Sequence, residues 1–236
     1  MTPSTPSNGI TRLAFFYDGS FFVRVSNYYK HYHDRKCYLS FSGLQEFVRQ
    51  FIAKEDGIPS SRCQTVQSHF FRGRFSLQAA KSANALESDR YFDHRLMDAG
   101  IVSHYYPMNE SVSPPQEKGI DVWMALEAYD LALRNAYDVL VLFVSDQDFM
   151  PLVRKVHGRG IRTLVISVDI RYTDNNGMDR SLATSQQLIH EASHLVWLSR
   201  EIDKPASAND PNISSLFAVP TKAAYVKPAL GVPRNP

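Results

Sequence analysis

The sequence has few cysteines, no long apolar run and no recognisable leader. Cys37 and Cys63 stand alone, without the spacing of a thiolate zinc site or the density of a disulfide framework. No apolar stretch approaches the roughly 20 residues of a membrane span, and the start MTPSTPSNG lacks the basic and hydrophobic regions of a signal peptide. We therefore expect a protein of a reducing compartment, the cytoplasm, with no membrane partner.

Excess charge and a nucleotide-binding loop are also missing. The formal net charge is only +2 over 236 residues, so any nucleic-acid surface has to be a local patch. The segment HGRGIR (157–162) follows a predicted helix rather than opening one, so we interpret Gly158 and Gly160 as a helix stop and a turn.

What the sequence does contain is an alternation of apolar runs with helical patterns, which is typical of βαβ units and a mainly parallel sheet. Hydrophobic residues make up 44% of the chain, enough for one sizeable α/β core. The expected strands are residues 12–17, 68–73, 101–106, 138–144 and 162–167. Helices are expected between them, at 44–55 after a capping box of Ser42 and Gln45, from about 76 to 99, over 119–136, from 150, and over 181–195.

Both ends of the chain have the composition of tails. Residues 1–10 and 201–236 are rich in proline and small polar residues, so we predict flexible tails around a domain at 11–200. Within the second tail, residues 216–228 carry apolar side chains amid prolines. This stretch could dock in an extended form on its own domain or on a partner.

Carboxylates follow two of the predicted strands. Asp18 ends the first strand, and Asp146 and Asp148 follow the strand at 138–144. The loops at the carboxyl ends of parallel strands converge, so the three acids share one crevice if the two strands are neighbours. Clustered carboxylates repel unless a cation or several donors balance them, and oxygen-only ligands suit Mg²⁺ or Mn²⁺.

Each acid also has a structural interpretation. Asp at a junction between a strand and a helix is often an N-cap, which would account for Asp146 or Asp148 taken singly. Asp121 falls in the first turn of the helix predicted at 119–136, where a carboxylate favours the helix dipole without any further role. Sequence spacing alone leaves these interpretations open.

The order of four motifs resembles the NYN domain, a PIN-like family that includes the LabA proteins. The motifs are AFFYDGSFF, HFFRGRF, EKGIDVWMALEAYDLAL and YDVLVLFVSDQDFMPLVRKVHGRGIRTLVIS, and the resemblance covers about residues 11–199. Its most specific part is Lys118-Gly119-x-Asp121 followed by Asp146-x-Asp148-Phe149-x-Pro151-Leu152.

The resemblance implies an α/β fold in the form of a three-layer α/β/α sandwich, and a metal-dependent ribonuclease activity. It implies that Asp18, Asp121, Asp146 and Asp148 are the catalytic and metal-binding residues, with Mg²⁺ or Mn²⁺ as the cofactor. The chemistry is consistent, because a bound metal lowers the pKa of an attacking water and offsets charge on the leaving oxygen of a phosphodiester.

The sequence departs from the family pattern at two places. Family members commonly read Asp-Gly-x-Asn after the first strand, and the Asn position here is Phe21, which can neither donate to nor accept from a phosphate. Relatives often place an Asp near the start of the last strand, where this chain has Ser193 and His194. We leave His194 outside the predicted site, since a lone histidine is more often structural.

RNA, single-stranded or structured, is the partner that the resemblance implies. Lys118, Arg72 and Arg74 are the predicted RNA-binding cations, and Phe70, Phe71 and Phe75 surround the two arginines as potential stacking platforms. The aromatic residues of a strand are equally explained as core. The polar segment 167–181 is interpreted as a mobile lip over the crevice, and self-association into a homo-oligomer is possible.

Two other functions compete with the ribonuclease. A binding or regulatory module that keeps the fold but has weak chemistry is favoured by Phe21. A phosphotransfer enzyme or receiver is disfavoured: the haloacid-dehalogenase pattern needs an Asp where this chain has Ser20, and receivers need an acidic pair directly after an early strand.

Overall fold

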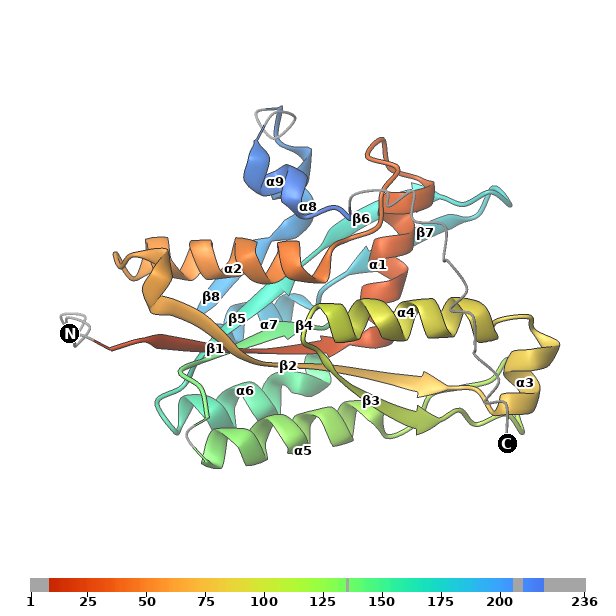
Figure 1. Ribbon diagram of the computed structural model, residues 1–236, viewed down its shortest axis with the longest axis horizontal. Helices are drawn as coiled ribbons and strands as arrows, with labels where there is room; N and C mark the ends of the chain where they lie inside the picture. The colour runs from red at the N-terminus through yellow and green to blue at the C-terminus, as the bar shows by residue number, and fades with distance from the viewer. Residues whose placement is uncertain (1–8, 135, 206–209, 219–236) are drawn as a thin grey trace, which may run out of the picture.

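A computed structural model describes residues 9–134, 136–205 and 210–218 of the chain. Its centre is a parallel sheet of six strands in the order β3-β2-β1-β4-β5-β8 (Figure 1). The strands of this sheet are β1 (Thr11–Asp18), β2 (Cys63–Arg74), β3 (Val102–Pro107), β4 (Val139–Phe143), β5 (Arg162–Ser167) and β8 (His194–Trp197).

Helices cover both faces of the sheet, so the expected three-layer α/β/α sandwich with a mainly parallel central sheet is confirmed (Figure 1). One layer holds α1 (Gly19–His31), α2 (Phe41–Glu55), α4 (Leu86–Asp98), α8 (Leu198–Asp203) and α9 (Pro211–Ser215). The other holds α5 (Ile120–Leu133), α6 (Met150–His157) and α7 (Gln186–Glu191). The short elements are α3 (Leu77–Ser82) and two 3-10 turns, η1 (Ser60–Arg62) and η2 (Gln147–Phe149).

Strands β1 and β4 form the middle of the core. Every residue of β4 is buried, as a continuous apolar run predicts for a strand that is covered on both faces. Alternate side chains enter two separate clusters: Phe15 and Tyr17 pack toward the α1 and α2 layer, whereas Phe16 packs toward α5 and α6. The two helical layers are therefore held to one sheet by side chains of the same strands.

The register of the sheet fixes where the strands end. In β1, Asp18 pairs with Phe71 of β2, and Tyr17 pairs with Phe143 of β4. Strands β1 and β4 are thus neighbours, which was the condition for the predicted acids to share one edge of the sheet. We refer to this edge, where the strands end, as the carboxyl edge, and to the opposite one as the amino edge.

Most predicted elements are confirmed, with corrections at their ends. The capping residue of α2 is Ser40, whose hydroxyl accepts from the backbone N–H of Gly43, and not Ser42. The helix predicted from about 76 to 99 is two helices, α3 and α4, with a break where Asn84 has a φ of 53°. The helix predicted over 181–195 is wrong at both ends, because residues 181–183 belong to strand β7 (Asp179–Ala183), residues 194 and 195 belong to β8, and only α7 is helical.

Helix α1 and a β-hairpin have no counterpart in the sequence analysis. Helix α1 follows β1 directly, and strand β7 pairs antiparallel with β6 (Asp169–Thr173) in a separate hairpin. The hairpin packs against α1 through Tyr172, whose ring lies 5.1 Å from that of Tyr28 and 4.6 Å from that of Tyr32. The segment interpreted as a mobile lip is therefore largely a β-hairpin that is anchored on a helix.

Ordered structure continues beyond the predicted domain boundary at residue 200. Helix α8 crosses that boundary, and α9 buries Ile213 in the core. Leu216 and Phe217 are also buried, and Phe217 lies 5.5 Å from the ring of Tyr29. The start of the predicted tail thus docks on its own domain, while residues 219–236, like residues 1–8, lie outside the described part. None of the described helices is long and apolar enough to cross a membrane.

Candidate metal centre

Asp18 is fixed at the junction of β1 and α1. Its Oδ1 accepts from the backbone N–H groups of Ser20 and Phe21, at 3.0 and 3.1 Å, and from the Ser20 hydroxyl at 3.0 Å. It is therefore the N-cap of α1. The following Gly19 allows this tight turn, because a Cβ there would lie 2.6 Å from the Phe71 carbonyl oxygen and the Phe70 ring.

Asp146 has the same role one strand away. Its Oδ1 accepts from the backbone N–H of Asp148 at 2.9 Å, as the cap of η2. A backbone hydrogen bond also holds the loop between β4 and η2, because the Ser145 carbonyl accepts from the N–H of Ser185 at 2.8 Å. Both capping bonds, on Asp18 and on Asp146, use Oδ1, and Oδ2 takes part in no hydrogen bond among the described residues. The structural and functional interpretations of these acids are therefore compatible.

Asp121 lies in the first turn of α5. The helix begins after Gly119, which has a φ of 77° and so occupies a conformation that side chains other than glycine rarely adopt. The preceding Lys118 is exposed at the same helix start. The Lys-Gly-x-Asp sequence thus sets a sharp turn and then directs a carboxylate toward the carboxyl edge.

The electrostatics show that the four predicted acids lie close together. Burial, as the largest cause, and then the charges of Asp18, Asp146, Glu117 and Asp148 together raise the pKa of Asp121 to about 6. Among the described residues, no cation is one of the groups that shift this pKa. The acids of two neighbouring strands and one helix therefore form a single negative cluster.

Glu117 is a member of this cluster that the sequence analysis missed. Its Oε1 accepts from the backbone N–H of Gly73, at the end of β2, at 2.7 Å. Gly73 leaves the room for this contact, because a Cβ there would lie 2.6 Å from the Glu117 Cγ. The only signal in the sequence was the position of Glu117 beside the Lys118-Gly119 motif.

The donor chemistry of the cluster fits a hard divalent ion. In the described ranges, no group of three or more His, Cys, Asp or Glu side chains is arranged to hold a metal ion. A closed cage is not required, however, because Mg²⁺ usually keeps several waters and binds through one or two carboxylates together with substrate phosphates. The cluster offers oxygen ligands, and its raised pKa at Asp121 reflects negative charge that a cation would offset.

Phe21 and His194, where the sequence departs from the family pattern, both lie outside the acidic cluster. Phe21 is only 1% exposed and its ring lies 5.6 Å from that of Phe143, so it is a core residue and offers no polar group to the cluster. His194 begins β8 and pairs with Leu164 in the sheet. It lies near Arg162 at the amino edge, 3.4 Å away, which agrees with leaving it outside the predicted site.

The predicted RNA-binding residues divide into two groups. Arg74 is held by Asp93 at 2.7 Å and lies 4.1 Å from the centre of the Tyr105 ring, so its charge is already paired. Phe70 and Phe71 are fully buried, so their prediction as stacking platforms is wrong. Phe75, by contrast, is 40% exposed. Lys118 is exposed, and Arg72 forms no ion pair with any described residue.

Comparison with known proteins agrees with this architecture. A crystal structure of VPA0982, a protein of unknown function from Vibrio parahaemolyticus, matches with a TM-score of 0.53 at 18% identity, over 81% of this chain and 95% of that one. This likeness concerns the fold alone. No curated protein matches the chain. A family model described as the NYN domain matches residues 16–199, which is most of the described chain and includes all four predicted aspartates, and the chain therefore belongs to the NYN family, with its PIN-like nuclease fold.

Proposed function

We propose that the protein is a metal-dependent ribonuclease that hydrolyses RNA phosphodiester bonds at the cluster of Asp18, Asp121, Asp146 and Asp148. The observation that carries this proposal is the crowding of carboxylates around Asp121, whose pKa is raised to about 6 by burial and by the charges of Asp18, Asp146, Glu117 and Asp148. Uncompensated like charges cost stability, and shifted groups of this kind gather at functional sites. Membership of a nuclease-type family gives the cluster its chemical interpretation.

The four acids would hold Mg²⁺ or Mn²⁺, which supplies an activated water and offsets charge on the leaving oxygen. The chain contributes rigid positioning: Asp18 and Asp146 are each fixed by hydrogen bonds to Oδ1, which leaves Oδ2 for a ligand. Asp121 exchanges its proton near neutral pH, and a neighbouring cation favours its charged form. Lys118, which is exposed just before α5, would contact a phosphate of the substrate.

A second candidate is an RNA-binding or regulatory module with weak chemistry. Phe21 favours it, because a buried ring stands where relatives commonly have an asparagine. With Phe21 in the core, the cluster lacks one polar group that could hold a metal-bound water or a phosphate. The two candidates share the fold and the partner, and they differ in whether the RNA is cut.

The test compares the purified wild-type protein with Asp146→Asn. Labelled single-stranded and double-stranded RNA are incubated with each protein in Mn²⁺, and with the wild type in EDTA. The ribonuclease proposal predicts cleavage by the wild type that needs the metal and is lost in Asp146→Asn. Equal cleavage by both proteins would contradict it, and binding by the wild type without cleavage would support the second candidate.

A further inference from the structure

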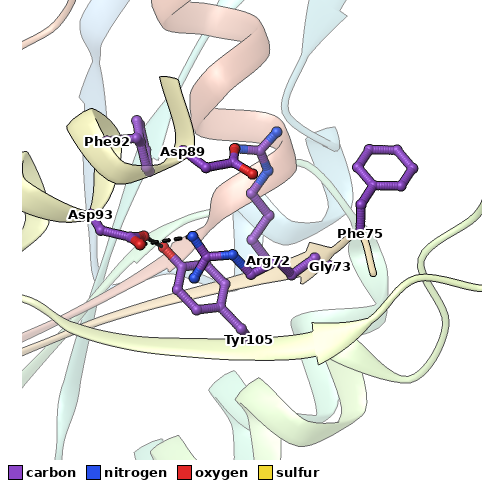
Figure 2. Close-up of a pocket in the computed structure, with 8 residues that line it drawn as sticks. Arg72, Gly73, Phe75, Asp89, Phe92, Asp93 and Tyr105 are labelled. Atoms are coloured by element: carbon purple, nitrogen blue, oxygen red, sulfur yellow. Dashed lines mark hydrogen bonds and ion pairs between the residues drawn. The ribbon is translucent and has the colours of Figure 1, made fainter. Parts of the chain in front are cut away.

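The far end of β2 carries a cavity that the acidic cluster does not use. It has a volume of about 300 Å³ and lies between the end of β2 and helices α3 and α4. A smaller cavity adjoins it and shares four lining residues with it, among them Phe75 and Asp89 (Figure 2). The volume is at the lower end of the range for small-molecule sites, which is large enough for a nucleobase with its ribose.

One wall of this cavity is apolar and unusually exposed. Phe75 is 40% exposed and Leu77 is 63% exposed, and Ala80 and Leu86 complete the apolar lining. A large aromatic ring that is open to solvent beside a cavity offers a face on which a planar group can stack. The four aromatic rings of β1 and β2 nearest the carboxyl edge, Phe16, Tyr17, Phe70 and Phe71, are buried in the core, so Phe75 stands apart from them.

The rim of the cavity offers both hydrogen-bond donors and acceptors. Asp93 accepts a hydrogen bond from Arg74 at 2.7 Å and another from the Tyr105 hydroxyl at 2.5 Å, so the charge of Arg74 is already paired. Asp93 and Tyr105 are drawn in Figure 2. Arg90 and Arg72 are free of such pairing among the described residues. In Figure 2 the Arg72 side chain extends toward Asp89, whose carboxylate supplies a hydrogen-bond acceptor to the cavity.

This combination suits one kind of ligand. A nucleobase has two apolar faces and an edge that carries both donors and acceptors, and single-stranded RNA is recognised by stacking its bases on aromatic rings and reading those edges. A peptide or a lipid would use the apolar wall, but neither needs a planar stacking face in the same cavity as an arginine and a carboxylate.

The cavity also has a defined position relative to the acidic cluster. Phe71 pairs with Asp18, and Phe75 follows four residues later along the chain. At about 3.3 Å per strand residue, the two positions are about 13 Å apart. Arg72 and Arg74 contact α4, whereas Asp18 caps α1 and acts on Asp121 at the start of α5, so a nucleic-acid strand that reaches both sites has to run along the carboxyl edge past Arg72. The cavity therefore suits a nucleotide beside the scissile one.

We propose that this cavity is a nucleobase subsite, in which Phe75 stacks on, and Asp89 hydrogen-bonds to, an unpaired base of the RNA that flanks the bond to be cut. The proposal rests on the ribonuclease function for the identity of its ligand. It adds the substrate class: a base has to leave its helix to enter the cavity, so the protein prefers single-stranded RNA. Arg72 contacts the phosphate that connects the two nucleotides.

The test measures RNA binding apart from cleavage. The full-length Asp146→Asn protein is titrated in EDTA against a short fluorescein-labelled single-stranded RNA of mixed sequence, and against the same strand annealed to its complement. Adding Phe75→Ala should weaken binding of the single strand by about 5- to 150-fold, as is typical when a stacking ring is removed. Binding of the duplex should be weaker and should change little.

Tyr91→Ala is the matched control. Tyr91 is an exposed aromatic residue of α4, 62% accessible, and it lines neither cavity. Its removal should leave RNA binding unchanged.

Arg72→Gln should lower the slope of log Kd against log salt by about 0.7, which corresponds to the loss of one phosphate contact on a single strand.

The position of the base is tested by replacing one nucleotide at a time with an abasic residue. The Phe75→Ala loss should vanish at a single position, which lies next to the cleavage site of the wild type, and Asp89→Asn should change base preference at that position only. If Phe75→Ala and Tyr91→Ala bind RNA as tightly as the parent, the subsite is wrong, even if Asp146→Asn has abolished cleavage. If Phe75 is required for binding but the wild type cuts no RNA, the subsite stands and the ribonuclease proposal fails.

Discussion

The two edges of the central sheet treat their carboxylates in opposite ways. At the amino edge, Asp138 accepts from the backbone and side chain of Arg12 at 2.8 to 3.0 Å, and Asp56 is paired with Arg162 at 2.5 Å. At the carboxyl edge, the acids around Asp121 are crowded together with no arginine among the groups that shift its pKa. Carboxylates at the amino edge are thus neutralised by arginines, whereas those at the carboxyl edge are not balanced by a cation.

The pKa values express this difference. Burial pushes the pKa of Asp138 upward, but the bonds from Arg12 and the charges of Arg12 and Arg162 outweigh it, so the pKa falls below its usual value. Burial and four like charges all push the pKa of Asp121 upward, to about 6. Ion pairs at the amino edge therefore stabilise the fold, whereas the carboxyl edge keeps a repulsion that a bound cation or protonation of Asp121 would relieve.

The largest expected difference between the edges concerns activity. Asp121→Asn should lower metal-dependent RNA cleavage by about 100-fold or more, because it removes a proposed oxygen ligand. Asp138→Asn, the matched change at the amino edge, should leave the rate within about twofold, since no part of the cluster depends on it. Initial rates on a labelled RNA measure both, and equal losses would remove the functional distinction between the edges.

For the free energy of unfolding, substitution of Asp138 should have a larger effect than substitution of Asp121. Asp138→Ala leaves the Arg12 guanidinium and backbone N–H without their acceptor and should lower the free energy of unfolding by about 1 to 2 kcal/mol. This value is modest because both side chains are about 40% exposed and solvent screens the pair. Urea unfolding gives the measurement, with Asp121→Ala as the comparison, which should lose less or gain stability.

Stabilisation by Mn²⁺ should depend on the acids of the carboxyl edge and not on those of the amino edge. At ten times its Kd, Mn²⁺ should add about 1.4 kcal/mol to the wild type by mass action, which raises Tm by about 3 to 6 °C for a domain of this size. The rise should be smaller in Asp146→Asn and unchanged in Asp138→Asn. Differential scanning calorimetry over a Mn²⁺ series tests this, and the same rise in all three proteins would place the ion elsewhere.

The smallest expected effect is an opposite pH dependence. Asp121 has a raised pKa, so the folded protein binds its proton more tightly than the unfolded chain, and without metal its contribution to stability falls as pH rises from about 4 through about 6. Asp138 has a lowered pKa, so its contribution is present above the unfolded value and is lost as pH falls through the folded value. In EDTA, Asp121→Asn should gain Tm relative to the wild type between pH 5 and pH 7. A constant difference over this range would show that Asp121 is not perturbed.

The architecture was predictable because apolar runs specify it. The apolar run at 139–144 indicates burial on both faces, and the rule that ligands lie at the carboxyl ends of parallel strands places Asp18 and Asp146 at one edge of the sheet. Helix α1 was missed because its aromatic and β-branched residues are weak helix formers, and Asp18 was considered for its charge rather than as a cap.

Features that depend on distant contacts could not be predicted. Arg74 is paired with Asp93, which is 19 positions away and meets it only because α4 packs over β2 and β3. Glu117 reaches Gly73 across 44 positions. Phe71 and Phe75 belong to the same motif, in which arginines lie between them. Phe71 is buried within β2, whereas Phe75 follows the end of the strand and is exposed. Pairing and exposure of individual side chains are tertiary properties that local patterns do not contain.

The central claim is that the acids of the carboxyl edge share a divalent cation. A crystal of the protein soaked in Mn²⁺, with data collected near the manganese absorption edge, tests it most directly. The account predicts an anomalous peak within coordination distance of carboxylate oxygens from Asp18, Asp121, Asp146 or Asp148. Full Mn²⁺ exposure with no peak at this edge, or a peak only at unrelated carboxylates, would contradict it.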